Sequence, residues 1–490
     1  MTSATNANRE SLRASLHKIL PKNNILETEE QTRPYECDGL TAFQQKPWIV
    51  VLPETIEQVQ DILRLCFYEG VPVVARGAGT GLSGGALPLA NGVLLSLAKF
   101  NRILEINPEN RSATVEPGVR NLAISQAVEE FNLYYAPDPS SQIACTIGGN
   151  VAENAGGVHC LKYGLTVHNI LQLKVITIDG ELLTIGSQGL DSPGYDLLAL
   201  MTGSEGMLGV IVEVVVKLLP RPEKAQVILA AFDDVEKAGT AVGAIIAEGI
   251  IPAGLEMMDN PAIRAAEHYA NVGYPKDAEA ILLCELDGTE EEVREQIKFV
   301  ENLLTEKGAT SLRTSKNESE RLQLWMGRKA AFPAVGRISP DYYCMDGTIP
   351  RYQLPAVLKQ ISELSSEYNL LVANVFHAGD GNLHPLILYD ANIKGELERT
   401  EEFGAKILEI CVKAGGTITG EHGVGKEKID QMCVQFKSLE LQMFHDIKHS
   451  FDPHALLNPG KAVPTLHRCA ELGGMHVHDG LLSHPELERF

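Results

Sequence analysis

Short apolar runs separated by turn residues dominate the first half of the chain. Runs rich in Val, Ile and Leu predict strands. The segment 55–69 has helical periodicity, and Thr55 and Gln58 have capping-box spacing at its start. We predict strands at 48–52, 73–76, 93–97, 103–106, 112–116, 171–178 and 210–219, and helices at 9–20, 55–69 and 121–132.

The pattern changes after residues 220–222, where two prolines indicate a linker. We predict strands at 226–232 and 280–286, helices at 234–248, 289–307, 317–331, 352–368, 396–414 and 427–450, and a hairpin of strands 370–377 and 383–389 around a turn at 379–382. This order of elements predicts an α+β fold with an antiparallel sheet in the second half. We divide the chain into a helical N-terminal segment 1–45, domains 46–222 and 223–464, and a tail 465–490.

Composition and charge narrow the possible partners. Of 490 residues, 44% are hydrophobic and 22% are charged, which is typical of a globular protein. The net charge of −22 argues against nucleic acid as a partner, and an anionic substrate would need local arginines or lysines. The nine cysteines include no Cys-x-x-Cys pair, so we expect no iron–sulfur cluster in this chain. With no apolar run of about 18 residues, we expect no membrane span and a cytoplasmic protein.

Residues 76–85 read Arg-Gly-Ala-Gly-Thr-Gly-Leu-Ser-Gly-Gly and follow a short apolar strand. The glycines remove Cβ atoms, so backbone N–H groups can converge on an anion such as a pyrophosphate. The loop is not a P-loop, because no Lys follows, and it lacks the acidic residue of a nicotinamide dinucleotide fingerprint. Taken alone, such a loop is equally well explained as a structural turn.

A second group of chemically active residues lies at the predicted hairpin. His377 and His384 flank its turn, and side chains facing each other across an antiparallel pair are about 5 Å apart at Cβ. Glu421 and His422 occur together between glycines. His377, His384 and Glu421 would suit a divalent ion, Zn, Mn or Fe. A purely structural role for the two hairpin histidines is the alternative.

These motifs together resemble the vanillyl-alcohol oxidase/p-cresol methylhydroxylase flavoprotein superfamily. The motifs of the first half are 76–85, 137–141, 146–150 and 202–206. Residues 377–384 and 420–423 resemble the branch that acts on D-2-hydroxy acids, and 342–350 and 465–469 extend the resemblance to the D subunits of bacterial glycolate oxidases. The resemblance implies a two-subdomain PCMH-type FAD-binding domain over 46–222. It also implies an FAD-linked oxidase cap domain over 223–464, carrying the substrate and metal sites, whose C-terminal helical segment returns to the flavin domain.

The resemblance implies FAD as the cofactor. The flavin should be noncovalent, because the first glycine loop has no histidine to tether it. Glu205, Gly209 and Ile211 would hold the adenosine end. The residues implied in FAD binding are Arg76, Gly77, Ala78, Gly79, Thr80, Gly81, Ser83, Pro137, Asp138, Ser141, Thr146, Gly148, Gly149, Asn150, Asn154, Gly156, Tyr163, Glu205, Gly209, Ile211 and Lys461.

The resemblance also implies a mechanism of hydride transfer from C2 of a 2-hydroxy acid to FAD. A metal ion would lower the pKa of the substrate hydroxyl. His422 is the candidate base, because an imidazole accepts protons at neutral pH, and simple packing is its alternative role. Arg328 resembles the family's carboxylate-binding arginine, whose planar fork suits a carboxylate. The alternative for Arg328 is a solvated position on a helix.

Substrate and partners follow from the same resemblance. Positions that carry polar or basic groups in the D-2-hydroxyglutarate branch hold Phe332 and Cys344, so a second substrate carboxylate would lack a cation. We therefore predict dehydrogenation of glycolate to glyoxylate, with D-lactate as the alternative and D-2-hydroxyglutarate less favoured. The resemblance implies a second flavin-domain subunit and an iron–sulfur subunit, which would pass electrons to quinone and hold the complex at the inner face of the membrane.

Two other functional classes remain open at this point. One is a flavin-binding scaffold without catalysis, which would have no need of His377, His384, Glu421 and His422 on two loops. The other is a metal-dependent hydrolase whose glycine loops are only turns. Bound flavin would exclude the hydrolase.

Overall fold

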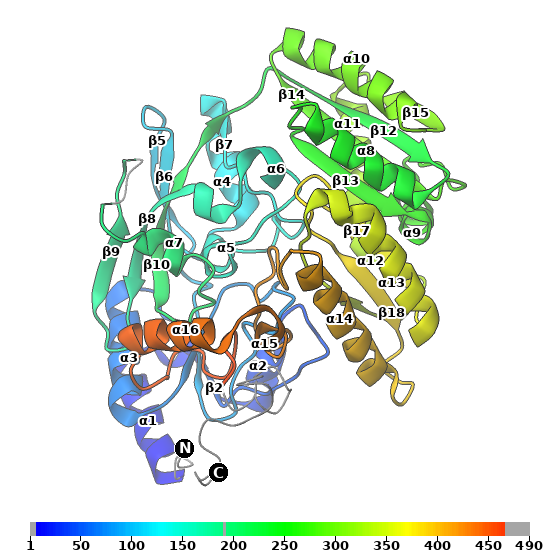
Figure 1. The fold of residues 1–490 in the computed structure, drawn as a ribbon. Helices are drawn as coiled ribbons and strands as arrows, with labels where there is room; N and C mark the ends of the chain where they lie inside the picture. Colours follow the sequence, from blue (N-terminus) through cyan, green and yellow to red (C-terminus); the bar gives the residue numbers. More distant parts are fainter. Residues whose placement is uncertain (1–5, 190–192, 466–490) are drawn as a thin grey trace.

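The computed structural model describes residues 6–189 and 193–465, and Figure 1 shows their arrangement. Nearly all of the predicted tail, and with it most of the motif at 465–469, lies outside these residues. None of the helices in the described ranges has both the length and the apolar character needed to cross a membrane.

A small sheet of order β1-β2-β4-β3 begins the chain. Its strands are β1 (Ile25–Leu26), β2 (Ile49–Val51), β3 (Val73–Arg76) and β4 (Val93–Ser96), and the last three run parallel. Helices α1 (Asn6–Ile19) and α3 (Ile56–Glu69) pack on each other, and the short α2 (Glu29–Thr32) precedes β2. The Thr55 side chain accepts from the Gln58 N–H at 3.3 Å, so the predicted start of α3 is confirmed.

A five-stranded antiparallel sheet of order β5-β6-β10-β8-β9 follows. Its strands are β5 (Ile103–Asn107), β6 (Ser112–Val115), β8 (Ile170–Ile176), β9 (Leu182–Gly186) and β10 (Val210–Lys217). The connections carry α4 (Asn121–Ala127), α5 (Ile147–Glu153), α6 (Cys160–Tyr163) and α7 (Leu197–Met201), while β7 (Leu133–Tyr134) pairs with β11 (Leu219–Pro220). The prediction missed β9, which is half exposed and lacks a continuous apolar run.

The second half is built on a seven-stranded antiparallel sheet of order β15-β12-β14-β13-β17-β18-β16, seen at the upper right of Figure 1. Its strands are β12 (Lys224–Phe232), β13 (Gly254–Asp259), β14 (Ala280–Gly288), β15 (Ser311–Thr314), β16 (Asp341–Cys344), β17 (Val372–Phe376) and β18 (Pro385–Tyr389). This confirms the predicted antiparallel sheet and its 370–389 hairpin.

Helices cover both faces of this sheet. One face carries α8 (Val235–Ala247), α10 (Glu290–Glu306), α13 (Leu354–Tyr368) and α14 (Glu396–Lys413), and the other carries α9 (Asn260–Ala270), α11 (Glu318–Lys329) and α12 (Ala331–Val335). Strand β12 shows why: Ile228 and Phe232 pack into the first helical layer, whereas Val227 and Leu229 pack into the second. Successive side chains of a strand point to opposite faces, and here both faces are apolar.

Several predictions about the second half were incomplete or wrong, and β15 and β16 were not predicted. The strand–helix unit β13–α9 was missed, because the apolar run of β13 is interrupted by the buried Glu256. The helix predicted at 317–331 is divided into α11 and α12. The single helix predicted at 427–450 is instead α15 (Met432–Gln435) and α16 (Ser438–Phe451), separated where Phe436 adopts an extended conformation.

The end of the described chain returns to the first half, as predicted. Leu457 forms a parallel bridge with Val73 of β3, and the Asn458 N–H donates to the Val73 carbonyl at 2.8 Å. The C-terminal segment thereby extends the edge of the first sheet. It lies beside the glycine loop that follows β3.

Candidate functional site

A cavity of about 450 Å³ is lined by residues from both halves of the chain. The glycine loop after β3, the N-terminal part of α5 and the start of β10 form its first-half walls. Lys329, Phe332, His377, Glu421 and His422 belong to its second-half wall. The two predicted groups of residues therefore share one cavity.

Glycine is required at particular points of this cavity. A Cβ on Gly77 would lie 2.3 Å from Thr146 Oγ1, and one on Gly148 would lie 2.5 Å from Pro117 Cβ. Gly79 has a φ of +71°, which disfavours other residues. The buried Thr146 Oγ1 and Ser83 Oγ have no hydrogen-bond partner within the described ranges. Such a cradle, with the Thr146 hydroxyl close to bare backbone, fits an extended phosphate-containing ligand.

Most of the residues predicted to bind FAD line this cavity. They are Arg76, Gly77, Ala78, Gly79, Thr80, Gly81, Ser141, Thr146, Gly148, Gly149, Asn150, Glu205, Gly209 and Ile211. The predicted residues outside its lining are Ser83, Pro137, Asp138, Asn154, Gly156, Tyr163 and Lys461.

Several of these outlying residues hold the cavity walls together. Asp138 contacts His159 Nδ1 at 2.9 Å, and Tyr163 Oη donates to Asp287 at 2.6 Å. The buried Lys461 donates to the Gly85 carbonyl at 2.9 Å. Gly156 lies against Glu421, whose Oε2 is 2.5 Å from where a Cβ would be. Their contacts are with protein groups that shape the cavity.

Glu205 lines the cavity, but its carboxylate already has protein partners. Its two oxygens accept from the N–H groups of Val424 and Gly425, both at 2.7 Å. Val424 and Gly425 lie two and three residues after His422 on the same loop. Glu205 thus connects the first half to the loop that carries these two residues. The predicted contact with an adenosine ribose would have to compete with these bonds.

His377, His384 and Glu421 converge from the hairpin and the 420–425 loop. Glu421 Oε1 is 3.2 Å from His377 Nε2 and 2.9 Å from His384 Nε2, and all three side chains are largely buried. Their ligand atoms lie within 4.8 Å of one another. The β17–β18 pairing places the two imidazoles close together, with ring centroids 5.0 Å apart.

The outer nitrogens of the two imidazoles also have partners. His377 Nδ1 lies 2.8 Å from Glu256 Oε1, and His384 Nδ1 lies 3.2 Å from the Met345 carbonyl. Acceptors at Nδ1 orient each ring with Nε2 towards Glu421.

Although burial acts to raise the pKa of Glu421, the two imidazoles hold it well below its usual value. Burial opposes charge on His377 and His384, but the neighbouring carboxylates raise the pKa of His377 well above 6.5, and Cys344 and Glu421 raise that of His384 to about 10. An ion would bind by displacing these protons, and two deprotonated imidazoles with a carboxylate form a donor set that fits a divalent metal.

Asp346, which follows β16, organises the loop that carries Glu421. This fully buried carboxylate accepts from the Gly420 N–H at 3.1 Å, the Glu421 N–H at 3.2 Å and the His422 N–H at 2.9 Å. Lys428 Nζ lies 3.2 Å away. Burial acts to raise the pKa of Asp346, but His422 and Lys428 hold it far below the usual range. A carboxylate that accepts several N–H bonds stays ionised.

His422 lies beside the set of His377, His384 and Glu421 and is not part of it. Its Nε2 is 3.9 Å from Glu421 Oε1, and its buried Nδ1 has no hydrogen-bond partner within the described ranges. Burial lowers the pKa of His422 to about 4, an effect that His384 adds to. The ring is therefore neutral at neutral pH and able to accept a proton.

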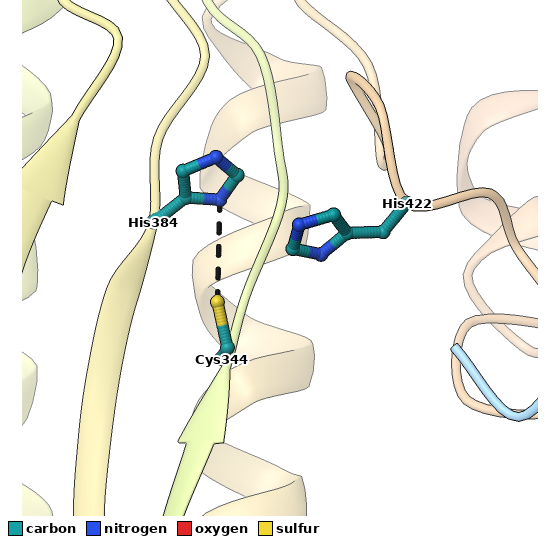
Figure 2. Close-up of side chains that lie close together, drawn as sticks. All are labelled: Cys344, His384 and His422. Atoms are coloured by element: carbon teal, nitrogen blue, oxygen red, sulfur yellow. Dashed lines mark hydrogen bonds between the residues drawn. The ribbon is translucent and has the colours of Figure 1, made fainter. Parts of the chain in front are cut away.

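Cys344 forms another grouping with His384 and His422, shown in Figure 2. Its Sγ lies 4.0 Å from His384 Nδ1. The rings of His384 and His422 are stacked, with centroids 4.8 Å apart and planes inclined by 10°. Nitrogen lone pairs lie in the ring plane, so two parallel imidazoles cannot direct them at one ion. This arrangement therefore favours the His377, His384 and Glu421 set as the metal site.

Arg328, predicted to bind the substrate carboxylate, lies behind the cavity wall. It is fully buried, and its Nε donates to Glu256 Oε2 at 2.8 Å. Glu256 thus contacts both Arg328 and His377, which is one of the proposed metal ligands. Arg328 Nη1 is buried and has no hydrogen-bond partner among residues 6–189 and 193–465. The neighbouring Lys329, which the sequence analysis did not single out, lines the cavity itself.

The predicted site residues did not include Glu256, Asp346, Lys329 or the cavity-lining Glu153. Glu256 had a detectable signal, because it is a lone charge within an apolar strand. Asp346 lies in the 342–350 motif and follows the apolar end of β16. Glu153 and Lys329 sit in helices, where a charged residue carries no positional signal.

Comparisons with known proteins agree with this arrangement. The family described as "FAD binding domain" matches residues 47–186, and that described as "FAD linked oxidases, C-terminal domain" matches residues 221–462. The glycolate oxidase subunit GlcD of Escherichia coli strain K12 is 67% identical over 482 residues, covering 98% of this chain and 97% of that protein. The chain belongs to the FAD-linked oxidase family.

Other FAD-linked oxidases are more distant. The GlcD subunit of Bacillus subtilis strain 168 is 40% identical, covering 87% of this chain and 91% of that protein. A D-lactate dehydrogenase of Archaeoglobus fulgidus is 32% identical, covering 86% of this chain and 92% of that protein. The predicted membership of the glycolate oxidase branch and the FAD-linked oxidoreductase class are confirmed, and FAD is the cofactor of the first half.

Solved structures establish the fold of this FAD-linked oxidase. p-Cresol methylhydroxylase with substrate bound superposes with a TM-score of 0.80 at 18% identity, covering 95% of this chain and 98% of that one. 4-Ethylphenol oxidase from Gulosibacter chungangensis gives a TM-score of 0.80 at 17% identity, covering 94% of this chain and 98% of that one. The predicted α+β fold with a PCMH-type FAD-binding part is confirmed.

Proposed function

We propose that this protein dehydrogenates a small D-2-hydroxy acid, glycolate in preference to others, to the corresponding 2-oxo acid. The observation that carries the proposal is that His377, His384, Glu421 and His422 line the same cavity as the glycine cradle of the FAD-binding half. The 67% identical relative is named a glycolate oxidase subunit, which supports glycolate as the substrate.

FAD would be held noncovalently by the glycine cradle. Bound FAD supplies the two-electron acceptor for the hydride that leaves C2 of the substrate. The backbone at Gly77–Gly81, with Thr146, would face the phosphates, because the glycines leave it bare and the buried Thr146 hydroxyl has no partner within the described ranges. No histidine lies in this loop to form a covalent link to the flavin.

A divalent ion would be held by His377, His384 and Glu421. A bound ion acts as a Lewis acid that lowers the pKa of the substrate hydroxyl. Glu256 and the Met345 carbonyl hold the two imidazoles in the orientation that directs Nε2 inwards, and Asp346 holds the backbone of Glu421. The donor set fits zinc, manganese or iron.

His422 would take the proton of the substrate hydroxyl. Its Nδ1 is buried and unpartnered within the described ranges, and its low pKa of about 4 keeps the ring neutral before the reaction. Arg328 would bind the substrate carboxylate, because the unsatisfied Nη1 is a buried donor that an anion can satisfy. Asp346 and Glu256 would position groups without touching the substrate.

D-Lactate is the second candidate substrate. The supporting observation is that D-lactate dehydrogenases of Anaerostipes hadrus and Archaeoglobus fulgidus are 31% and 32% identical over most of this chain. D-2-Hydroxyglutarate is disfavoured, because Phe332 occupies the cavity wall beside His384, at 6.2 Å between ring centroids.

Electrons would leave the flavin through partner subunits. The relative's name calls it a subunit, which supports a multi-subunit complex here. We propose a second flavin-domain subunit and an iron–sulfur subunit as partners, a cytoplasmic location, and contact with the inner face of the membrane through those partners.

The proposal is tested by anaerobic reduction of bound flavin. Glycolate is expected to bleach the flavin fastest, ahead of D-lactate, with L-lactate and D-2-hydroxyglutarate slow. Removal of metal with a chelator should abolish bleaching while FAD stays bound, and adding zinc, manganese or iron should restore it. Bound flavin that no 2-hydroxy acid reduces would contradict the proposed function.

A further inference from the structure

We call the cavity of about 450 Å³ that holds the candidate site the site cavity. A second cavity, of about 150 Å³, adjoins it. It is lined by the 39–42 segment, by β16 and the residue before it, and by the end of β18. The lining residues are Gly39, Leu40, Thr41, Ala42, Leu82, Pro340, Asp341, Tyr342, Cys344 and Tyr389. None of these residues has a role in the chemistry proposed above.

Leu82 belongs to the lining of both cavities. It follows Gly81 of the glycine loop and packs against the apolar cluster that contains Cys344. Its Cδ2 lies 3.1 Å from the position that a Cβ would take on Gly39, which is itself in the second cavity. The Leu82 side chain is thus part of the wall between the two spaces.

The rest of this wall adjoins the proposed metal site. Cys344 lines the second cavity and lies 4.0 Å from His384, which lines the first. Phe332 lines the first cavity, and its ring centroid is 6.3 Å from that of Tyr342, which lines the second. The second cavity therefore adjoins the site cavity along the part of its wall that carries Leu82, Phe332 and His384.

We propose that Leu82 sets the chain-length limit of the substrate by closing the site cavity from the second cavity, which is the space a longer 2-hydroxy acid would need. This inference rests on the proposed function and specifies which acids that site admits. With Leu82 in place, carbons beyond C3 meet the wall, so the methyl group of D-lactate is still admitted. Glycolate has no carbon beyond C2 on that side and is unaffected.

Charge decides which tails the second cavity would accept. Asp341 lines it, and its carboxylate is held there by the Ala391 N–H at 2.9 Å. Among its lining residues there is no lysine or arginine. A second carboxylate would therefore be repelled, whereas an alkyl tail would contact Leu40 and the tyrosine rings. D-2-Hydroxyvalerate and D-2-hydroxyglutarate have equal carbon numbers and differ at the terminal carbon, which is a methyl group in one and a carboxylate in the other.

The test compares kcat/KM for D-2-hydroxyvalerate, D-2-hydroxyglutarate and glycolate in the FAD- and metal-loaded protein. Wild type should favour glycolate over D-2-hydroxyvalerate by at least about tenfold. Leu82→Ala should raise the ratio of kcat/KM for D-2-hydroxyvalerate to kcat/KM for glycolate by about 10- to 60-fold, since each buried methylene contributes about fourfold. Leu82→Val should raise it less. The ratio for D-2-hydroxyglutarate should stay low in both variants.

Leu40→Ala is the matched control. It removes the same side chain from the second cavity without touching the wall, because Leu40 does not line the site cavity. The ratio should stay at the wild-type value. A direct binding measurement, the flavin absorbance change on adding 2-oxovalerate, should show tighter binding in Leu82→Ala only.

Two results would overturn the inference. One is a wild-type protein that oxidises D-2-hydroxyvalerate as efficiently as glycolate, which can be measured even if the variants do not fold. The other is an unchanged ratio in FAD-loaded Leu82→Ala and Leu82→Val. Both differ from failure of the proposed function, in which wild type would bind FAD but no 2-hydroxy acid would reduce it.

Discussion

At the scale of single residues, buried carboxylates hold the candidate site in place. Asp346 fixes the backbone of the 420–422 segment, Glu256 bridges His377 and Arg328, and Glu205 holds Val424 and Gly425. Each of them uses its charge on protein N–H groups or on neighbouring side chains. A group that positions others through several bonds is sensitive to small chemical changes.

Asp346→Asn should weaken metal binding. An amide offers one acceptor oxygen where the carboxylate offers two, so the Gly420, Glu421 and His422 N–H groups and Lys428 lose charge-assisted bonds. We expect about a 10- to 100-fold loss of metal affinity, measured by competition with a fluorescent chelator. Asp452→Asn is the control, since Asp452 is also a buried carboxylate that accepts from a backbone N–H, that of Leu457, and from Lys448, but it lies in the C-terminal return segment. Unchanged affinity in Asp346→Asn would contradict the role given to it.

Arg328 and Lys329 can be distinguished by paired variants. If Arg328 binds the substrate carboxylate, Arg328→Lys should raise the KM for glycolate by about tenfold or more, because an ammonium cannot replace the planar fork. Lys329→Gln should then change KM little. Steady-state kinetics with an artificial dye acceptor measures both. The reverse result would transfer the carboxylate-binding role to Lys329, the residue that lines the cavity.

At the scale of elements, a polar latch joins the first half to the second-half sheet and α11. We define the latch as Asp138, His159, Glu285, Arg321 and Trp325. His159 lies 2.9 Å from Asp138 and 3.2 Å from Glu285 of β14, and Glu285 accepts from Arg321 at 2.8 Å and from Trp325. Asp138 directly precedes the cavity-lining residues Pro139–Ser141. The latch thereby connects the FAD cavity to the helix that carries Arg328.

The latch should make stability depend on pH. Burial acts against charge on His159, but Asp138 and Glu285 hold its pKa well above 6.5, so its contribution is present below pH 6.5 and is lost as pH rises further. The pKa of Glu285 is lowered to about 2 from 4.5, chiefly by His159, so its contribution is present above pH 4.5 and is lost towards pH 2. The latch therefore contributes most between pH 4.5 and 6.5.

His159→Gln should lower stability by about 3 kcal/mol at pH 6, the cost of leaving a buried charge unpaired. The difference from wild type should shrink at pH 9, where His159 moves towards its neutral form. Urea unfolding midpoints at the two pH values measure this. Arg64→Gln is a control for general charge effects, because Arg64 forms only a partly exposed ion pair and a bond to Gly180. A difference independent of pH would argue against an ionised His159.

At the scale of the whole molecule, the site exists only because distant segments meet. The chain end returns to β3, where Lys461 donates to the Gly85 and Leu87 carbonyls and Asn458 donates to Gly85 and Glu205. The Ala462 N–H in turn donates to the Gly425 carbonyl at 2.8 Å. The returning segment therefore holds the FAD loop and the Glu421 loop against each other.

Lys461→Met should loosen this junction. It keeps the aliphatic stem but removes the Lys461 donor from the Leu87 carbonyl and leaves the Gly85 carbonyl with Asn458 alone, at a cost of about 1–3 kcal/mol. We expect about a tenfold or greater loss of FAD affinity, measured by the recovery of flavin fluorescence on dilution. The exposed Lys437→Met should have no effect. Equal FAD retention in the two variants would show that the return segment does not support the FAD loop.

The sequence alone determined the features whose chemistry is local. Gly77 and Gly79 indicate a stretch of backbone where side chains would clash or be strained. The positions of His377 and His384 on either side of a tight turn predict that their side chains are close, because the two strands of a hairpin pair locally. Periodicity located most of the helices and strands. Prediction failed at β13 and at 427–436, where a buried charge and close loop contacts override periodicity.

Only the tertiary structure decided which groups serve each other. Glu256 lies 121 residues from His377, Glu205 lies 219 from Val424, and Asp346 lies 75 from Glu421. No local pattern encodes such pairs, because each depends on how two sheets and their loops pack. The same holds for the burial of Arg328, the cavity position of Lys329 and the wall formed by Leu82. The sequence therefore determines which functional groups are present, and the packing of the two halves determines which of them hydrogen-bond to each other and which line the cavity.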